Sequence, residues 1–200
     1  MKKTLVLFAH PRFEDSRANA TLIDRLFSKS HITLHDLYET YPDFHINVRK
    51  EQKLLEEHDI IIWHHPLYWY SSPAILKQWM DMVLEFNWAY GPEGNMLQGK
   101  TVFNVITTGG SREVYCSQGY NSYTINEFLR PFEQTANLCG MHYLPPFAVM
   151  GTHKLSEEQL LDYANQYENL IDLLKGDFDA TGFSNCFFLN DLELIKNPNS

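Results

Sequence analysis

Short apolar runs alternate with amphipathic segments through most of the chain. The apolar runs cover residues 5–9, 32–35, 60–63, 101–107 and 143–150. Their nearly continuous apolar character is typical of strands that are covered on both faces. Several of the segments between them carry apolar residues at spacings of three and four, as in a helix with one buried face. A strand followed by a helix, repeated about five times, predicts an α/β fold with a doubly wound parallel sheet.

Prolines indicate where several of these elements begin, bend or lie in the sheet. Pro73 occupies an expected first helical position, with Ser72 as the N-cap before it. Pro131 falls inside the helical segment 125–138 and is expected to kink it. Two prolines interrupt the last apolar run, 143–150, which we therefore expect at an edge of the sheet.

The length of the chain suits one domain. Two hundred residues can bury enough surface to fold without disulfides or a metal ion. A capping box at Ser156 opens a final helix that we expect to end near Leu174. We therefore expect one domain over residues 1–175, followed by a C-terminal tail over 176–200. The tail is partly apolar at 186–189 and could pack on the body or on a second subunit.

Charge and cysteine content narrow the function classes. A net charge of −9 argues against a general nucleic-acid binder, which would need a basic patch. The three cysteines, at 116, 139 and 186, are far apart and form no CxxC motif, so a reducing compartment is expected. The apolar start is too short for a signal peptide, and no apolar run is long enough to span a membrane. We expect a cytoplasmic protein.

Three polar or aromatic loops follow predicted strands, at residues 9–19, 65–74 and 107–115. In a parallel sheet with helical crossovers, such loops open on one edge. The three are therefore expected to meet at one crevice. Their combined chemistry favours a cofactor there, and specifically a flavin mononucleotide (FMN).

The first loop suits a phosphate. Residues 16–19 open a predicted helix, whose unpaired amides and dipole attract anions. Ser16 can add a hydroxyl, Arg17 a charge and His10 a ring N–H. Taken alone, the loop is explained equally well by Ser16 as a plain N-cap and His10 as a polar strand end.

The other two loops suit a flat ring. Residues 66–69 supply backbone amides and two aromatic rings. Gly109 and Gly110 let backbone N–H groups approach a ligand, because no Cβ intervenes. Those amides could stabilise negative charge on the N1/O2 side of a flavin, and Tyr115 could donate its hydroxyl there. The alternative is that residues 107–110 form an ordinary turn and that the aromatic residues are core or interface.

Two other motifs are weaker than they first look. Residues 94–101 match the P-loop pattern GxxxxGK[ST], but they lead into a predicted strand rather than a helix. A nucleotide kinase or NTPase using this segment remains a third, weaker reading. His64 and His65 are neighbours in a strand and point to opposite faces, so they cannot readily share a metal ion. We expect no functional metal.

Several motifs together resemble a known family. They are AHP (9–11), SRAN (16–19), LYxxYPDF (37–44), HPLYWYSSPAILKQWMD (65–81), LQGK (97–100), TTGG (107–110), LRPFE (129–133) and LPPF (144–147). From about residue 3 to 175 the chain resembles the flavodoxin-like NAD(P)H:quinone oxidoreductases. Within that family it is most similar to bacterial ancillary proteins of glutathione-regulated potassium-efflux systems. The resemblance implies a flavodoxin-like five-stranded parallel sheet of order 2-1-3-4-5, with helices on both faces.

The resemblance also implies a function. NADH or NADPH would reduce FMN, and a quinone would then take the hydride, by a ping-pong mechanism. The implied FMN-binding residues are His10, Ser16, Arg17, Ala18, Asn19, Pro66, Leu67, Tyr68, Trp69, Thr107, Thr108, Gly109 and Gly110. The implied catalytic residues are Tyr115, Gly109 and Gly110. A homodimer is implied, and the ancillary branch implies docking on the cytoplasmic face of an inner-membrane potassium/proton antiporter. An alternative role is therefore regulation of that antiporter, with the flavin structural or redox-sensing.

One position departs from the family pattern. Mammalian quinone reductases of the family carry a Tyr and, six residues later, a His that is thought to relay charge. Tyr115 matches the first, but the second position is Asn121. An asparagine cannot titrate, so we expect slower or differently coupled quinone reduction.

Overall fold

A parallel sheet forms the centre of the protein. The computed structural model describes residues 1–176, 183 and 186–196. Within them the strands are β1 (Thr4–Phe8), β2 (Ile32–Asp36), β3 (Ile60–Pro66), β4 (Thr101–Thr108), β5 (His142–Tyr143) and β6 (Phe147–Met150). Their order is β2-β1-β3-β4-β5, with β6 also paired to β4. Every pair is parallel, so the predicted flavodoxin-like order is confirmed.

The edge of the sheet beside β4 differs from the prediction. A single strand over 143–150 was expected, but two short strands, β5 and β6, share this edge. Residues 144–146 separate them, and two of these are prolines, which have no N–H to donate to β4. The sheet therefore has six strands among the described residues instead of five.

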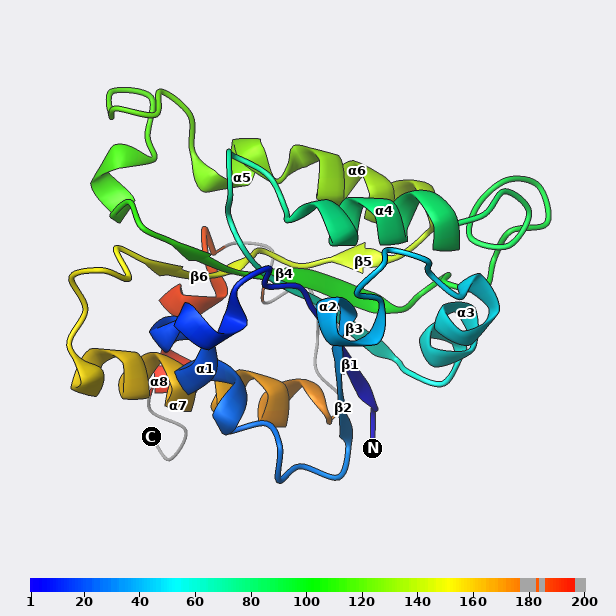
Figure 1. Cartoon of the computed structure of the whole chain (residues 1–200), viewed down its shortest axis with the longest axis horizontal. Coiled ribbons are helices and arrows are strands. Elements are labelled where there is room, and N and C mark those ends of the chain that lie inside the picture. Colours follow the sequence, from blue (N-terminus) through cyan, green and yellow to red (C-terminus); the bar gives the residue numbers. More distant parts are fainter. Residues whose placement is uncertain (177–182, 184–185, 197–200) are drawn as a thin grey trace.

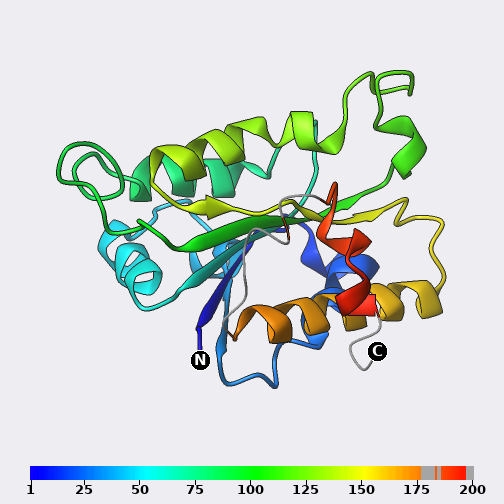
Figure 2. The same cartoon turned by 180° about the vertical axis from the view of Figure 1, so that it is seen from behind.

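Helices cover both faces of the sheet (Figures 1 and 2). On one face lie α2 (Leu37–Thr40), α3 (Val48–Glu56), α4 (Ala74–Val83), α5 (Ile125–Phe128) and α6 (Arg130–Leu138). On the other lie α1 (Arg17–Asp24) and α7 (Glu157–Leu174). Alternate residues of β3 supply the two cores: Ile61 and Trp63 pack toward the first layer, Ile60 and Ile62 toward the second.

Three helix boundaries test the expected helix starts and the expected kink. Pro73 is itself the N-cap residue of α4, and no side chain caps that helix, so Ser72 as N-cap was wrong. The segment around Pro131 is two helices rather than one kinked helix, since the chain leaves helical geometry at Leu129 and Pro131 lies in the first turn of α6. The capping box at Ser156 is confirmed, and α7 ends at Leu174.

The described tail residues pack on the body. A 3-10 turn, η4 (Leu189–Asp191), lies against β6, and α8 (Glu193–Lys196) lies against α7. Phe188, Leu189 and Ile195 are buried there. Across the described part of the chain, no helix combines the length and apolar character needed to cross a bilayer.

Candidate functional site

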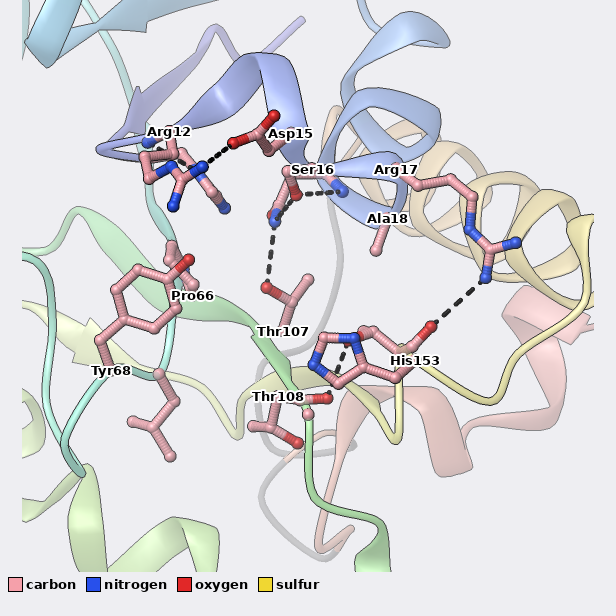
Figure 3. A pocket seen from close by; sticks show the side chains of 15 residues that line it. Arg12, Asp15, Ser16, Arg17, Ala18, Pro66, Tyr68, Thr107, Thr108 and His153 are labelled. Atoms are coloured by element: carbon pink, nitrogen blue, oxygen red, sulfur yellow. Dashed lines mark hydrogen bonds and ion pairs between the residues drawn. The ribbon is translucent and has the colours of Figure 1, made fainter.

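Loops from three strands meet at the carboxyl edge of the sheet and enclose a cavity of about 570 Å³. Figure 3 shows Ser16 and Ala18 on one side of it, Thr107, Thr108 and His153 on another, and Pro66 and Tyr68 at one end. The cavity is lined by His10, Arg12, Asp15, Ser16, Arg17, Ala18, Asn19, Pro66, Leu67, Tyr68, Thr107, Thr108, Gly109, Thr152 and His153. The expected convergence of the three loops is therefore present.

The start of α1 offers hydrogen-bond donors to the cavity. The Ser16 Oγ accepts from the Asn19 amide at 3.3 Å and from Asn19 Nδ2 at 2.8 Å. Because both lone pairs of that oxygen are used, its O–H remains free to donate. The amides of Arg17 and Ala18 have no acceptor within the described structure. Three donors at a helix N-terminus form a site of the kind that binds phosphate.

Asn19 links the residues of this site from its buried side. Its Nδ2 also donates to Thr107 Oγ1 at 3.1 Å, while its Oδ1 lies 3.1 Å from His64 Nε2. The side chain is buried and links α1 to β3 and β4. Asn19 was expected to bind the ligand, but its side-chain amide is already occupied by Ser16, Thr107 and His64. The side chain thereby holds the Ser16 hydroxyl in place, while Asn19 itself also lines the cavity.

Positive charge lies at the rim of the cavity. The Arg17 guanidinium donates to the Leu155 carbonyl at 2.5 Å and lies 3.4 Å from the Thr152 carbonyl, toward the loop after β6 (Figure 3). It was expected to offer its charge to a phosphate, whereas here it connects α1 to that loop. Arg12 is paired with Asp15.

Four lining residues were not among the predicted ligand residues: Arg12 and Asp15, which lie within the predicted loop 9–19, and Thr152 and His153, which lie outside all three predicted loops. The last two follow β6, the fourth strand whose carboxyl end reaches this edge. A search for polar residues after every predicted strand would have found them.

His10 is a neutral donor. Its Nδ1 accepts from the Arg12 amide at 3.2 Å, which leaves the ring proton on Nε2. Burial lowers the pKa of His10, against the opposing effects of Glu14 and Asp15. The ring can therefore donate one N–H without carrying charge.

A second cavity, of about 410 Å³, adjoins the first at Leu67. It is lined by Leu67, Trp69, Tyr70, Gly110, Val114, Tyr115, Tyr120 and Asn121. Three residues expected at a single crevice, Trp69, Gly110 and Tyr115, therefore lie here rather than in the first cavity. Aromatic side chains dominate its wall, which suits a flat ligand.

The two glycines between the cavities keep the backbone open. A Cβ on Gly109 would lie 2.9 Å from His153 Nε2, and one on Gly110 would lie 2.8 Å from Val114 Cγ2. Neither amide has an acceptor in the described structure. A side chain at either position would need its neighbour to move, so the glycines leave two backbone donors accessible at this junction.

Tyr115 and Asn121 face the second cavity as neutral groups. Burial raises the pKa of Tyr115, while a hydrogen bond with Thr108 opposes the change, so its hydroxyl keeps its proton near neutrality. The Asn121 Oδ1 accepts a long hydrogen bond, 3.4 Å, from the Tyr70 hydroxyl. Neither group can take up a proton at neutral pH.

The P-loop-like segment and the two neighbouring histidines lie as the sequence indicated. Residues 94–99 lead into β4, and Lys100 donates to the carbonyls of His58 at 2.6 Å and Glu56 at 3.3 Å. His64 and His65 point to opposite faces: the first contacts Asn19 in the α1 layer, while the second stacks on Phe132 of α6. The described residues contain no cluster of three or more potential metal ligands.

Comparisons with known proteins agree with this architecture. A family model described as a flavodoxin-like fold matches residues 2–171. The potassium-efflux ancillary protein KefG of Erwinia tasmaniensis is 45% identical over 170 residues, which are 85% of this chain and 92% of that protein. The uncharacterized NAD(P)H oxidoreductase YrkL of Bacillus subtilis is 47% identical over 175 residues, 88% and 99% of the two chains.

Solved structures of two other proteins are also similar to this chain. General stress protein 14 of Treponema denticola, crystallised in complex with FMN, superposes with a TM-score of 0.83 at 36% identity and covers 86% of this chain and 99% of that one. An NADPH-quinone reductase from P. pentosaceus superposes with a TM-score of 0.78 at 33% identity, over 88% and 99% of the two chains.

Proposed function

The chain belongs to the flavodoxin-like fold family, and from that membership we propose that it is an FMN-dependent NAD(P)H:quinone oxidoreductase. The observation that carries the proposal is the set of unpaired donors at the start of α1. These donors lie across the first cavity from Gly109, which follows β4 and precedes Gly110. The relatives named as an NAD(P)H oxidoreductase and an NADPH-quinone reductase support it, as does the one crystallised with FMN.

The donors of the first cavity fit the phosphate and ribityl parts of FMN. We assign the phosphate to the Ser16 hydroxyl and the amides of Arg17 and Ala18. His10 would donate its Nε2–H from the strand end. The ring would lie between the loop at 66–69 and residues 107–110, where Leu67 is common to both cavities.

Bound FMN supplies two-electron hydride chemistry, with NAD(P)H as the donor and a quinone as the acceptor. The chain's own part is to orient and to stabilise charge. The amides of Gly109 and Gly110 would donate to the ring edge where negative charge grows, and Tyr115 would add a neutral hydroxyl. The aromatic second cavity would take donor and acceptor in turn, as a ping-pong mechanism requires.

Replacing Ser16 by alanine is expected to weaken FMN binding by at least tenfold, since a hydrogen bond to a charged group contributes about 1.5–3 kcal/mol. The measurement is a fluorescence titration of the flavin-free protein with FMN. Asn47→Ala is the matched control, because it removes the same kind of side-chain cap from α3 on the other face of the sheet, and Asn47 lines neither cavity. Equal FMN affinity in the Ser16 and Asn47 variants would contradict the assignment.

Changing Asn121 to histidine is expected to raise the rate of quinone reduction severalfold at pH 6–7, because a histidine there can exchange a proton near neutrality. Stopped-flow reoxidation of the reduced protein by menadione, as a function of pH, measures the effect. An unchanged rate with an unchanged pH profile would mean that this position carries no proton relay.

Anaerobic titration of the purified protein decides the proposed function. We expect a yellow protein whose absorbance near about 450 nm is bleached by NADH or NADPH and restored by menadione. Failure to retain added FMN would overturn the proposal, and bleaching without recovery would limit the activity to the first half-reaction.

We propose further that the protein is a homodimer. Two large aromatic side chains at the mouth of the second cavity, Trp69 and Tyr120, are 93% and 91% exposed. Exposed aromatic groups beside a cavity are typical of an interaction surface. Sedimentation equilibrium tests this: a dimer that Trp69→Ala weakens supports it, and a monomer at micromolar concentration rejects it.

A second candidate function is regulation of a glutathione-gated potassium-efflux antiporter, at the cytoplasmic face of the inner membrane. The 45% identity to KefG, over most of both chains, favours it. Potassium efflux from vesicles that hold such an antiporter, with and without this protein, tests the role. Stimulation by the flavin-free protein would make the flavin unnecessary for it.

A further inference from the structure

We propose that residues 186–196 of the C-terminal tail form a positioning element for the second cavity, with Arg112 as the residue through which they act. The proposal deepens the proposed function, on which its kinetic part rests. The tail lies beyond residues 2–171, the part matched by the family model, so this role would belong to the chain's own extension.

The described tail is fixed to the sheet and to α7. Its Leu189 amide donates to the Pro146 carbonyl at 3.0 Å, and its Asn190 Oδ1 accepts from the Ala148 amide at 2.7 Å. Asn169 of α7 donates to the Ile195 carbonyl at 2.9 Å. Figure 2 shows this segment (red) beside α7 and the β6 edge. A segment with buried apolar groups and backbone hydrogen bonds is a firm base for further contacts.

From this fixed position the tail contacts the turn that follows Gly109 and Gly110. Arg112 opens η2 (Arg112–Val114), and its two terminal nitrogens lie 3.2 and 3.3 Å from the two carboxylate oxygens of Asp191. The same guanidinium lies 4.8 Å from the centre of the Phe188 ring. A two-point ion pair combined with a cation–π contact fixes the direction of the arginine better than either alone.

A second contact, a hydrogen bond, holds the other end of the same segment. Asn126 at the start of α5 donates to the Phe187 carbonyl at 3.1 Å. The chain between Arg112 and Asn126 is thus held at both ends by tail residues between 187 and 191. This stretch carries four of the eight residues that line the second cavity: Val114, Tyr115, Tyr120 and Asn121.

The other contacts that hold this segment are few: Tyr115 packs on the core and against Phe128, the Tyr123 ring also contacts Phe128, and Asn121 accepts the long hydrogen bond from Tyr70. Tyr120 and Tyr123 are exposed, and its inner hydrogen bonds are short-range turns such as Asn121 to Val114. A cavity wall built on such a loop keeps its shape only when residues behind it restrict its motion. The tail supplies that restriction, so it sets where Tyr115 lies relative to the ligand.

The test compares Arg112→Gln, Asp191→Asn and the double variant in the full-length protein. Hydrogen exchange of the amides at 112–124 is expected to become about fivefold faster in each, without further change in the double variant, because both substitutions break one interaction. In the FMN-loaded enzyme we expect the KM for menadione to rise about threefold or more while kcat stays within about twofold. Arg130→Gln is the matched control: its ion pair with Glu133 is similarly exposed, 67% and 36% against 56% and 35%, but lies on α6.

The outcomes separate the two proposals. If hydrogen exchange at 112–124 is unchanged in the variants, the tail does not restrict this segment. If exchange becomes faster but the KM for menadione is unchanged, the tail does not position the residues of the second cavity. Should the wild-type protein not bind FMN, the proposed function fails, whereas the exchange measurement still decides whether the tail holds the wall of the cavity.

Discussion

Replacing Glu51 by alanine is expected to lower the free energy of unfolding by about 3–5 kcal/mol, because it removes the shared acceptor of a buried hydrogen-bonded cluster. Glu51 is fully buried in α3. Its Oε1 accepts from the Tyr41 hydroxyl at 2.5 Å and lies 2.9 Å from His35 Nε2, and its Oε2 accepts from Trp79 Nε1 at 2.8 Å. Urea denaturation measures the change.

The charge of Glu51 explains the size of this effect. Burial by itself would raise its pKa, but the hydrogen bonds from His35, Tyr41 and Trp79 lower it overall, so the carboxylate is ionised in the folded protein. Truncation leaves three buried groups without their acceptor. Glu57→Ala, at the exposed C-cap of α3, is the control and should change stability by less than about 0.5 kcal/mol. A similar small loss at Glu51 would refute this account of the cluster.

Lowering the pH from 7 to 5 is expected to reduce the free energy of unfolding by about 3–4 kcal/mol, through two buried neutral histidines. Burial lowers the pKa of His64 to about 3 and that of His65 to about 4. In the unfolded chain both would titrate near 6.5. Between about pH 6.5 and 4 the unfolded state therefore binds more protons, so stability is present above pH 6.5 and is lost as the pH falls.

Urea unfolding at pH 7, 6 and 5 measures this loss of stability. Single variants show how much of the loss each histidine causes. His64→Asn and His65→Gln should each reduce the difference between pH 7 and 5 by about 1.5–2 kcal/mol, whatever they do to stability at pH 7. His142→Gln, at an exposed site, should leave the difference intact. If the decline with pH persists unchanged in both variants, other groups cause it.

The acid effect should also reach the site. His64 Nε2 pairs with Asn19, whose Nδ2 donates to Ser16, the residue proposed to bind the FMN phosphate. Protonating the unfolded chain draws protein out of this arrangement, so FMN release on acidification should follow unfolding.

The alternation of apolar runs and helices was enough to predict the class of fold, because side-chain periodicity is a local property. The position of the loops followed from it, since the carboxyl ends of parallel strands share one edge. Of the predicted ligand residues, all but Trp69 and Gly110 line the first cavity, and these two line the second.

Local signals failed where a choice depended on distant partners. Pro73 was predicted at the first helical position, but it is the N-cap residue of α4. The last apolar run was predicted as one strand, but two short strands pair with β4. His153 reaches the cavity only because β6 ends beside β4.

The sequence by itself therefore determined the order of elements, the sheet and the meeting point of the loops. Only the tertiary structure decided what each polar side chain does. Asn19 is bonded to Thr107, 88 residues away, and Arg112 to Asp191, 79 residues away. The physical reason is that a hydrogen bond needs its partner within about 3 Å, a condition that folding, and no spacing along the chain, satisfies.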